Sequence, residues 1–226
     1  MGARICFLAP RGVGTWAQEL ALPAASTAFL PPSLGFIDAA ALPLAGLSAW
    51  AGLVTAGRIE RGSRVLIHGG AGGVGGVAVQ LARHLGAYVI STCSARNAEF
   101  VRGLGAHEVI PYDQVPFETV AREIDLALDL VGGDVHGRTH QVLRPGSVLV
   151  YLNAAPIADH TPRADVRVEM AQVLPDAAAL AGIVRLAADG ILRPHVEQVL
   201  PFERFREAQA MAESGVGRGK IVLAVR

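Results

Sequence analysis

The pattern of apolar and polar residues changes character along the chain. From residue 64 onward, short apolar runs rich in β-branched residues alternate with stretches of helical pattern that end at glycine or proline. Residues 1–32 lack this rhythm and hold short apolar stretches broken by prolines. Strands separated by helices predict βαβ units and a parallel sheet. We therefore expect an α/β fold preceded by a separate β-rich remnant.

The individual elements follow from the same pattern. Expected strands are the apolar runs 64–68, 88–92, 108–110, 124–130, 147–152, 166–174, 196–200 and 220–225. Expected helices are 77–85, 97–104, 135–143, 177–188 and 203–213, with Asp176 as the N-cap of the fourth. Residues 39–57 carry no charge and approach membrane-spanning length, but their proline, glycine and alanine content favours a buried helix of a soluble protein.

Composition narrows the class of protein. Apolar residues make up 51% and charged residues 18% of the 226 residues, which predicts packed rather than disordered segments. The formal net charge is zero, so a nucleic-acid partner is not expected. Cys6 and Cys93 form no C-x-x-C pair, which speaks against a structural zinc lobe and favours free thiols in a reducing cytoplasm. The N-terminus lacks the apolar length of a signal peptide, and we predict a cytoplasmic protein.

A glycine-rich motif stands directly after the first expected strand of the alternating region. Residues 70–75 read GAGGVG and match G-x-G-x-x-G between a strand and a helix, which is typical of a dinucleotide site. The three motif glycines would allow the tight turn, the approach of a pyrophosphate and close packing of the helix on the strand. Amides at the helix N-terminus would then bind the phosphates. The predicted residues of this loop are Gly70, Gly72, Gly73, Val74 and Gly75.

The end of the second strand indicates which dinucleotide is bound. NAD enzymes place an Asp or Glu about 20 residues beyond the glycines, to bind the ribose hydroxyls. Here the segment 91–96 reads STCSAR, and no carboxylate occurs before Glu99. Ser94 and Arg96 supply a hydroxyl and a guanidinium, which suit a 2′-phosphate. The sequence therefore favours NADP(H), with a solvent-exposed Arg96 as the alternative.

Other chemical groups fit structural roles better. His136 and His140 lie four apart on an expected helix, but without the Glu of a zinc-protease motif, and we predict a solvated pair rather than a metal site. Asp125 and Asp129 share one face of an expected strand. Asp129 stands at the end of this strand, where its carboxylate would either bind loop amides or take part in catalysis. No G-x-S-x-G elbow supports hydrolase chemistry.

Several motifs in order resemble one superfamily. The chain resembles the medium-chain dehydrogenase/reductases, and within them the zinc-independent quinone oxidoreductases. The resemblance rests on 12–19 (GVGTWAQE), 39–50 (AAALPLAGLSAW), 68–75 (HGGAGGVG), 125–133 (DLALDLVGG) and 219–223 (GKIVL).

The resemblance implies a domain arrangement. Residues 1–35 would be a truncated remnant of a GroES-like substrate domain, 36–190 a Rossmann domain with a doubly wound parallel sheet, and 191–226 a segment that returns to the remnant. Most of the GroES-like domain, which closes the substrate cleft in this family, would precede residue 1. A misplaced gene start and a genuinely shortened protein both explain this, and a partner chain is a further way to complete the cleft.

Further site residues are implied by the resemblance alone. Tyr112 would join Arg96 near the adenosine phosphate, the backbone near Val131 would approach the nicotinamide ribose, and Asn153 would lie near the carboxamide. Trp50 and Tyr151 would line the substrate space, and Tyr151 is a candidate proton donor. No metal ligand is expected. The strand 166–174 would form an exposed sheet edge, which predicts a homodimer.

These features lead to one leading function and two alternatives. The leading hypothesis is an NADPH-dependent reductase of enones, quinones or similar small molecules with an activated double bond, in which the cofactor supplies the hydride. Without the GroES-like domain the nicotinamide side would be open to water, which motivates a non-redox cyclase or lyase on a natural-product intermediate. A nucleotide-binding module without catalysis is the third possibility.

Overall fold

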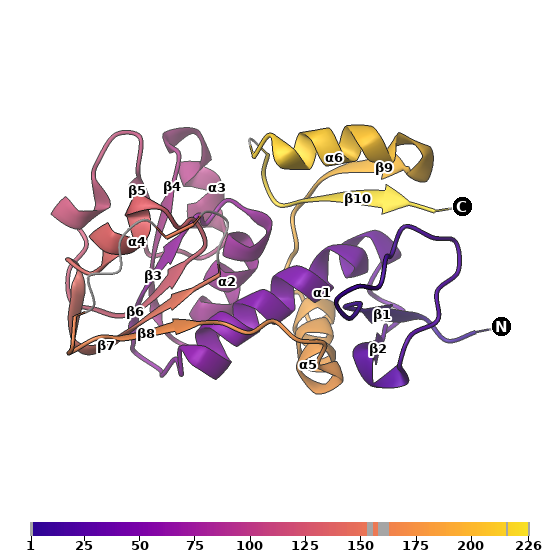
Figure 1. Cartoon of the computed structure of the whole chain (residues 1–226), viewed down its shortest axis with the longest axis horizontal. Helices are drawn as coiled ribbons and strands as arrows, with labels where there is room; N and C mark the ends of the chain where they lie inside the picture. The colour runs from indigo at the N-terminus through magenta and orange to yellow at the C-terminus, as the bar shows by residue number, and fades with distance from the viewer. Residues whose placement is uncertain (1, 153–155, 158–162, 216, 226) are drawn as a thin grey trace. The chain divides into compact units, whose positions relative to one another are not determined.

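The structure is a computed structural model that describes residues 2–152, 156–157, 163–215 and 217–225 (Figure 1). Two compact units divide the chain. The first combines the chain up to Leu47 with the chain from Val173 onward, and the second is Ser48–Gln172. The predicted domains 1–35, 36–190 and 191–226 have other bounds, and their assignment as domains stays a prediction.

The second unit is built on a six-stranded sheet in the order β5-β4-β3-β6-β7-β8. Every neighbouring pair in this sheet is parallel. In chain order this is the 3-2-1-4-5-6 arrangement of a doubly wound dinucleotide-binding fold, so the predicted Rossmann fold is confirmed. The strands are β3 Arg64–His68, β4 Tyr88–Cys93, β5 Glu108–Pro111, β6 Ile124–Asp129, β7 Leu143–Tyr151 and β8 Arg167–Met170.

Three α-helices connect these strands: α2 Gly73–His84, α3 Ala98–Gly103 and α4 Asp134–Thr139. The predicted helix 135–143 is too long, because the chain returns to the sheet at Leu143, which pairs with Ile124. The predicted strand 166–174 is also too long, since β8 ends at Met170. β8 stands last in the strand order, so the edge position predicted for this segment is confirmed.

The core of the second unit lies between sheet and helices. The central strands are apolar on both faces, as expected of a parallel sheet covered on both sides. Of the six residues in β6, all but Asp125 are buried. One cluster of buried residues joins strands and connections, and comprises Leu66, Ile90, Ile110, Phe117, Ala121, Ile124, Ala127, Val142, Leu143, Leu149 and Val166.

The first unit holds two small two-stranded sheets. β1 (Ile5–Phe7) and β2 (Thr27–Phe29) are antiparallel, while β9 (Val196–Pro201) and β10 (Lys220–Ala224) are parallel. The helices α5 (Ala177–Ala188) and α6 (Phe205–Glu213) complete this unit. The predicted N-cap of α5 is confirmed, because the Asp176 carboxylate accepts the amide of Ala179 at 2.9 Å.

The apolar helix predicted at 39–57 is observed as α1 (Phe36–Trp50) followed by a π-helical segment, Ala51–Ala56. Together these residues are long and apolar enough to cross a membrane by length and composition, and 72% of their most apolar window is buried. Such burial is typical of a core helix. Its glycines permit close packing: a Cβ on Gly46 would lie 2.6 Å from Ile183 of α5, and a Cβ on Gly52 would lie 2.6 Å from Leu128 of β6.

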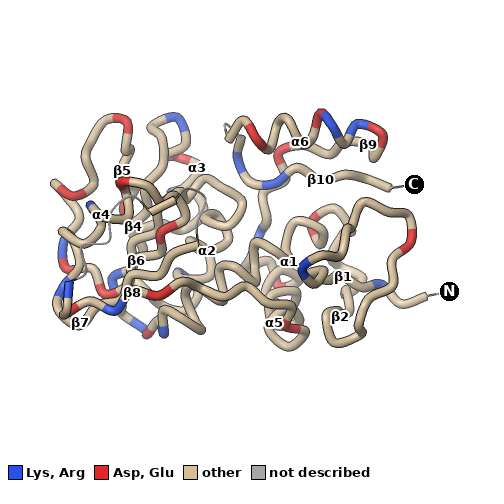
Figure 2. The backbone as a smooth tube through the Cα atoms, in the orientation of Figure 1, with Lys and Arg blue, Asp and Glu red and all other residues tan. Residues whose placement is uncertain are grey.

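Charged residues of both signs are interspersed in both units (Figure 2). Some helices are poor in charge, and α1 holds Asp38 as its single charged residue. The distribution agrees with the formal net charge of zero.

Candidate functional site

The strand order places a switch point at the carboxyl ends of β3 and β6. From β3 the chain winds toward β4 and β5, and from β6 it winds the other way, toward β7 and β8. Ligands of open α/β sheets bind in the crevice outside such a point. Two loops border it here: the glycine loop 69–72 after β3 and the loop 130–133 after β6, which we call the β6 loop. A Cβ on Gly69 would lie 3.6 Å from a methyl of Val131, so the two loops are neighbours.

The glycine loop is a tight turn that opens directly into α2. Gly69 has a φ of 76°, which glycine adopts without strain. The amide of Gly70 donates to the carbonyl of Thr92 at 2.9 Å, and that of Gly72 to the carbonyl of Gly69 at 3.0 Å. Gly72 is the N-cap residue of α2, and no side chain caps the amides at this helix N-terminus. The first amides of α2 therefore remain for an anion, as at other dinucleotide-binding helices.

The motif glycines differ in what a side chain would meet. A Cβ on Gly75 would overlap the carbonyl oxygen of Gly69 and lie 2.9 Å from the Cα of Gly70, so this glycine lets α2 pack against the turn. A Cβ on Gly70 would overlap the Ser91 hydroxyl. At Gly72, by contrast, a Cβ would make only an ordinary 3.4 Å contact. Packing thus explains Gly70 and Gly75, but it does not require a glycine at position 72.

The end of β4 brings together the residues predicted for the adenosine phosphate. Cys93 accepts the amide of Tyr112 at 3.0 Å, which joins the ends of β4 and β5. Asn97 donates to the Ser94 hydroxyl at 3.1 Å, and Arg96 is exposed in the same turn. Tyr112 is 61% exposed. Ser94, Arg96 and Tyr112 therefore share this edge of the sheet.

Sequence reasoning missed one carboxylate at this edge. Asp113 accepts the amide of Ala95 at 2.8 Å, and it thereby holds the turn that carries Ser94 and Arg96. The residue lies beyond the next strand in sequence, so the usual spacing rule for NAD enzymes does not reach it.

The β6 loop is organised by a buried carboxylate. Asp129 is 1% exposed, and its Oδ1 accepts the amides of Val131 and Gly132, each at 2.9 Å. Its Oδ2 lies 3.0 Å from Nδ1 of His136, the second residue after the start of α4. Burial alone would raise the pKa of Asp129, but the hydrogen bonds from His136, Gly132 and Val131 outweigh it and lower the pKa. Of the two roles considered for Asp129, binding of loop amides is the one observed.

The prediction of a solvated histidine pair is wrong. His136 is 1% and His140 8% exposed, because α4 turns this face toward the sheet. An ionised carboxylate only accepts, so Nδ1 of His136 carries the proton of the hydrogen bond to Asp129. Among the described residues, no group of three or more His, Cys, Asp or Glu side chains is placed to hold a metal ion. The zinc-independent assignment stays a prediction.

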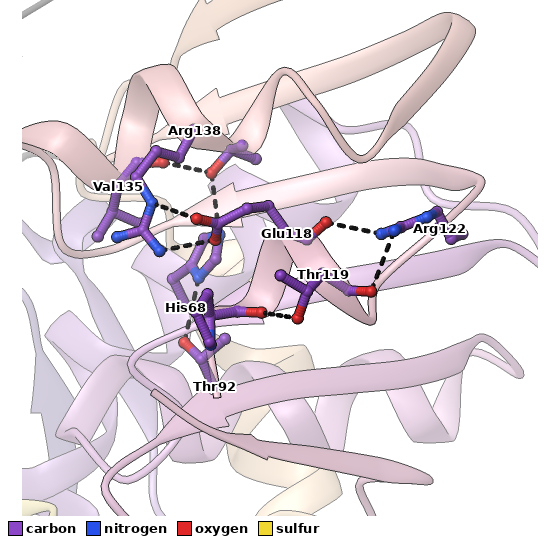
Figure 3. Close-up of polar contacts among 9 residues, drawn as sticks. His68, Thr92, Glu118, Thr119, Arg122, Val135 and Arg138 are labelled. Atoms are coloured by element: carbon purple, nitrogen blue, oxygen red, sulfur yellow. Dashed lines mark hydrogen bonds and ion pairs between the residues drawn. The ribbon is translucent and has the colours of Figure 1, made fainter. Parts of the chain in front are cut away.

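A second buried histidine, not singled out from the sequence, lies beneath the glycine loop. His68 ends β3, and its Nδ1 and Nε2 lie 3.1 and 3.0 Å from the hydroxyls of Thr92 and Thr139 (Figure 3). The Thr139 hydroxyl donates to the carbonyl of Val135 at 2.6 Å, so it accepts from Nε2–H. Thr92 then donates to Nδ1. Burial lowers the pKa of His68 to about 4, which keeps the ring neutral.

An ion pair covers this histidine on one side. Arg138 of α4 binds Glu118 through Nε at 2.9 Å and Nη2 at 2.6 Å (Figure 3). The guanidinium lies 5.0 Å from the ring centre of Phe117, whose ring in turn contacts His68 edge-on at 4.6 Å. Arg122 binds the carbonyls of Glu118 and Thr119 and closes the turn. A histidine at the end of the apolar run 65–67, directly before the glycines, was the sequence signal for this layer.

Four further predicted residues complete the comparison with the sequence. Tyr151 ends β7, is half-buried, and meets the ring of His136 edge-on at 5.2 Å. Trp50 ends α1 and is half-buried. Val131 is 38% exposed in the β6 loop. Asn153 lies outside the described residues. The functional roles of all these residues stay predictions.

Comparison with known proteins identifies related chains. Residues 104–223 match the family model described as zinc-binding dehydrogenase. The mitochondrial NAD(P)H oxidoreductase RTN4IP1 of Danio rerio is 30% identical over 94% of this chain and 63% of its own length. A 2-haloacrylate reductase from a Burkholderia species is 37% identical over 70% of this chain and 50% of its own length. The chain thus spans between half and two thirds of these relatives.

Solved structures agree with this assignment. The quinone oxidoreductase from Coxiella burnetii superposes with a TM-score of 0.89 at 29% identity, and the match covers 100% of this chain and 73% of that one. The similarity therefore extends over both compact units.

Proposed function

Because this chain belongs to the zinc-binding dehydrogenase family, within the medium-chain dehydrogenase/reductase superfamily, we propose that it binds NADPH and reduces an activated double bond of the enone or quinone type. The observation that carries the proposal is the glycine loop at the switch point of the sheet, where the first amides of α2 are left without a side-chain cap. Relatives named as an NAD(P)H oxidoreductase and a 2-haloacrylate reductase support the reaction class.

Two features favour NADPH over NADH. Arg96 and Ser94 follow β4, where an NAD enzyme carries an acidic residue for the ribose hydroxyls. A guanidinium and a hydroxyl instead match the charge and the acceptor oxygens of a 2′-phosphate. The Asp113 carboxylate is engaged with the Ala95 amide, so it holds this turn rather than a ribose hydroxyl.

The chain's own residues would hold and orient the reactants. When bound, the reduced nicotinamide would supply a hydride to the substrate's double bond. The glycine loop residues Gly70, Gly72, Gly73, Val74 and Gly75 would hold the pyrophosphate, and Val131 of the β6 loop would meet the nicotinamide half. Tyr151 is the candidate proton donor, and unchanged turnover in Tyr151→Phe would remove it from that role.

The direct test is consumption of NADPH by purified protein with a panel of enones, quinones and 2-haloacrylate. Turnover with NADPH supports the proposal. Conversion of a substrate without loss of NADPH would favour the non-redox cyclase or lyase instead. NADPH binding without conversion of any substrate would favour a non-catalytic module.

We also propose a homodimer that forms through the edge strand β8. Only its β7 side is paired in the described structure, and Val168 and Met170 are 39% and 48% exposed along it. An unpaired edge is a template for a second copy. Light scattering coupled to size-exclusion chromatography should give twice the chain mass, and a species of 23.5 kDa alone would contradict the dimer.

We propose a cytoplasmic location because Cys6 and Cys93 are both free thiols, which are typical of a reducing compartment. One relative carries the word mitochondrial in its name. Fractionation of the source cells with an antibody against this chain distinguishes the two compartments.

A further inference from the structure

The two loops at the switch point offer opposite hydrogen-bonding groups. In the glycine loop, α2 starts without a side-chain cap, so its first amides are donors directed out of the helix. In the β6 loop, three consecutive amides are already bound within the protein. Val131 and Gly132 donate to Asp129, and Gly133 donates to the carbonyl of Pro156 at 3.1 Å.

Because these three amides are already hydrogen-bonded within the protein, they limit what the β6 loop can bind. A loop whose N–H groups are bound within the protein has only backbone carbonyl oxygens left to offer a ligand, and carbonyls accept hydrogen bonds only. The Gly133 carbonyl accepts the His136 amide at 3.3 Å, which leaves the carbonyls of residues 130–132 for this role. Such a surface repels phosphate oxygens and suits hydroxyl or amide N–H groups. In a dinucleotide, the phosphates need donors, whereas the nicotinamide ribose and the carboxamide can donate.

The inward arrangement depends on Asp129 and on His136, its side-chain partner among the described residues. The carboxylate is almost fully buried at the end of β6, where an unpaired charge is costly. His136, equally buried on α4, donates to the oxygen that the loop amides leave unused. This contact fixes the carboxylate so that its other oxygen faces the amides of Val131 and Gly132.

We propose that Asp129 and His136 act as a pair of positioning residues that turn the amides of the β6 loop inward, so that the loop accepts from the nicotinamide half of the cofactor. The proposal rests on the proposed function, since it assigns the two halves of NADPH to the two loops. The glycine loop serves the phosphates through donors, and the β6 loop serves the hydroxyl and carboxamide groups through acceptors. Neither Asp129 nor His136 touches the cofactor itself.

The test compares NADPH with a ligand that lacks the nicotinamide half. Adenosine 2′,5′-bisphosphate carries the adenosine and the 2′-phosphate but nothing that reaches the β6 loop. Binding of both ligands is measured by calorimetry in the wild type, His136→Phe and His136→Asn. Phe fills the ring space without a donor, while Asn places an N–H near the position of Nδ1. Circular dichroism confirms that each variant is folded.

His136→Phe should weaken NADPH binding about tenfold or more, the scale of one hydrogen bond to a charged group. It should leave adenosine 2′,5′-bisphosphate binding unchanged, and His136→Asn should restore part of the NADPH affinity. Equal loss of both ligands, or no loss of NADPH affinity, overturns the inference alone. A wild type that binds neither ligand overturns the proposed function and the inference with it.

A second variant covers the case in which His136→Phe does not fold. Asp129→Asn keeps an oxygen for the loop amides but turns an N–H toward His136, with little change in volume. It should weaken NADPH binding more than adenosine 2′,5′-bisphosphate binding. Identical changes for the two ligands would overturn the inference.

Discussion

The loops that follow β3 and β6 border the same switch point, yet they are shaped in opposite ways. The glycine loop owes its form to missing side chains, because a Cβ on Gly75 or Gly70 would overlap neighbouring atoms. The β6 loop owes its form to side chains, since the Asp129 carboxylate accepts its amides and His136 binds that carboxylate. The glycine loop is therefore sensitive to substitutions that add a side chain, and the β6 loop to substitutions that remove a hydrogen bond.

This difference teaches how much of a site can be recognised from local sequence. A loop made by glycines has a signature at fixed spacing. A loop made by a buried pair depends on two residues brought together by the fold, and its parts look ordinary until the strand and the helix are in place.

The largest expected effect comes from the most crowded position of the glycine loop. Gly75→Ala should destabilise the protein by about 3 kcal/mol, because a new Cβ there overlaps backbone atoms that cannot move aside. In an ordinary helix the same change would stabilise by up to about 1 kcal/mol, so the sign itself is diagnostic. Urea unfolding measures the difference.

Gly72→Ala is the matched control. Its Cβ makes only a 3.4 Å contact, so unfolding should change by less than about 0.5 kcal/mol while NADPH binding is strongly weakened. Unchanged NADPH affinity in folded Gly72→Ala would show that the phosphates of the cofactor do not bind at this loop.

A smaller effect is expected from the buried layer beneath the glycine loop. The pKa of His68 is about 4 in the folded protein and near 6.5 when unfolded, so the unfolded chain binds more protons between these values. The stability that the neutral His68 contributes is fully present above pH 6.5 and is lost as the pH falls toward 4. When the pH is lowered from 7.5 to 5.0, protonation of this histidine in the unfolded chain should lower the free energy of unfolding by roughly 2 kcal/mol.

Urea unfolding of wild type and His68→Gln at the two pH values isolates this contribution. The variant should lose roughly 2 kcal/mol less than the wild type on acidification. Equal losses in both proteins would show that His68 is not held neutral by burial.

The smallest expected effect lies at the exposed end of β4. Arg96→Ala should weaken NADPH binding about tenfold and leave NADH binding unchanged, because only NADPH carries the 2′-phosphate. Arg102→Ala, another exposed arginine on the adjacent helix α3, is the control and should change neither. A parallel loss of both nucleotides in Arg96→Ala would speak for a structural role of this residue.

The parts predicted correctly from the sequence were those with a local cause. The glycine loop, the parallel sheet and the N-cap Asp176 each follow from residues a few positions apart. The edge position of the strand after Val166 was also correct, although β8 is shorter than predicted.

The errors concern residues whose partners are distant. His136 and His140 have helical spacing and polar neighbours, which favours a solvated face, but the face is buried because Asp129 of β6 lies opposite His136. The end of α4 was misplaced because Leu143 finds its partner, Ile124, in another strand. Asp113 and His68 were overlooked since their partners, the Ala95 amide and the Thr92 hydroxyl, lie 18 and 24 positions away in the sequence.

The most direct test of the central claim is a fluorescence titration of the purified chain with NADPH, with NADH in parallel. We expect NADPH to bind with a dissociation constant on the order of micromolar and NADH to bind much more weakly. Failure of both nucleotides to bind would contradict the proposed NADPH site, because the glycine loop would then be a turn without a ligand.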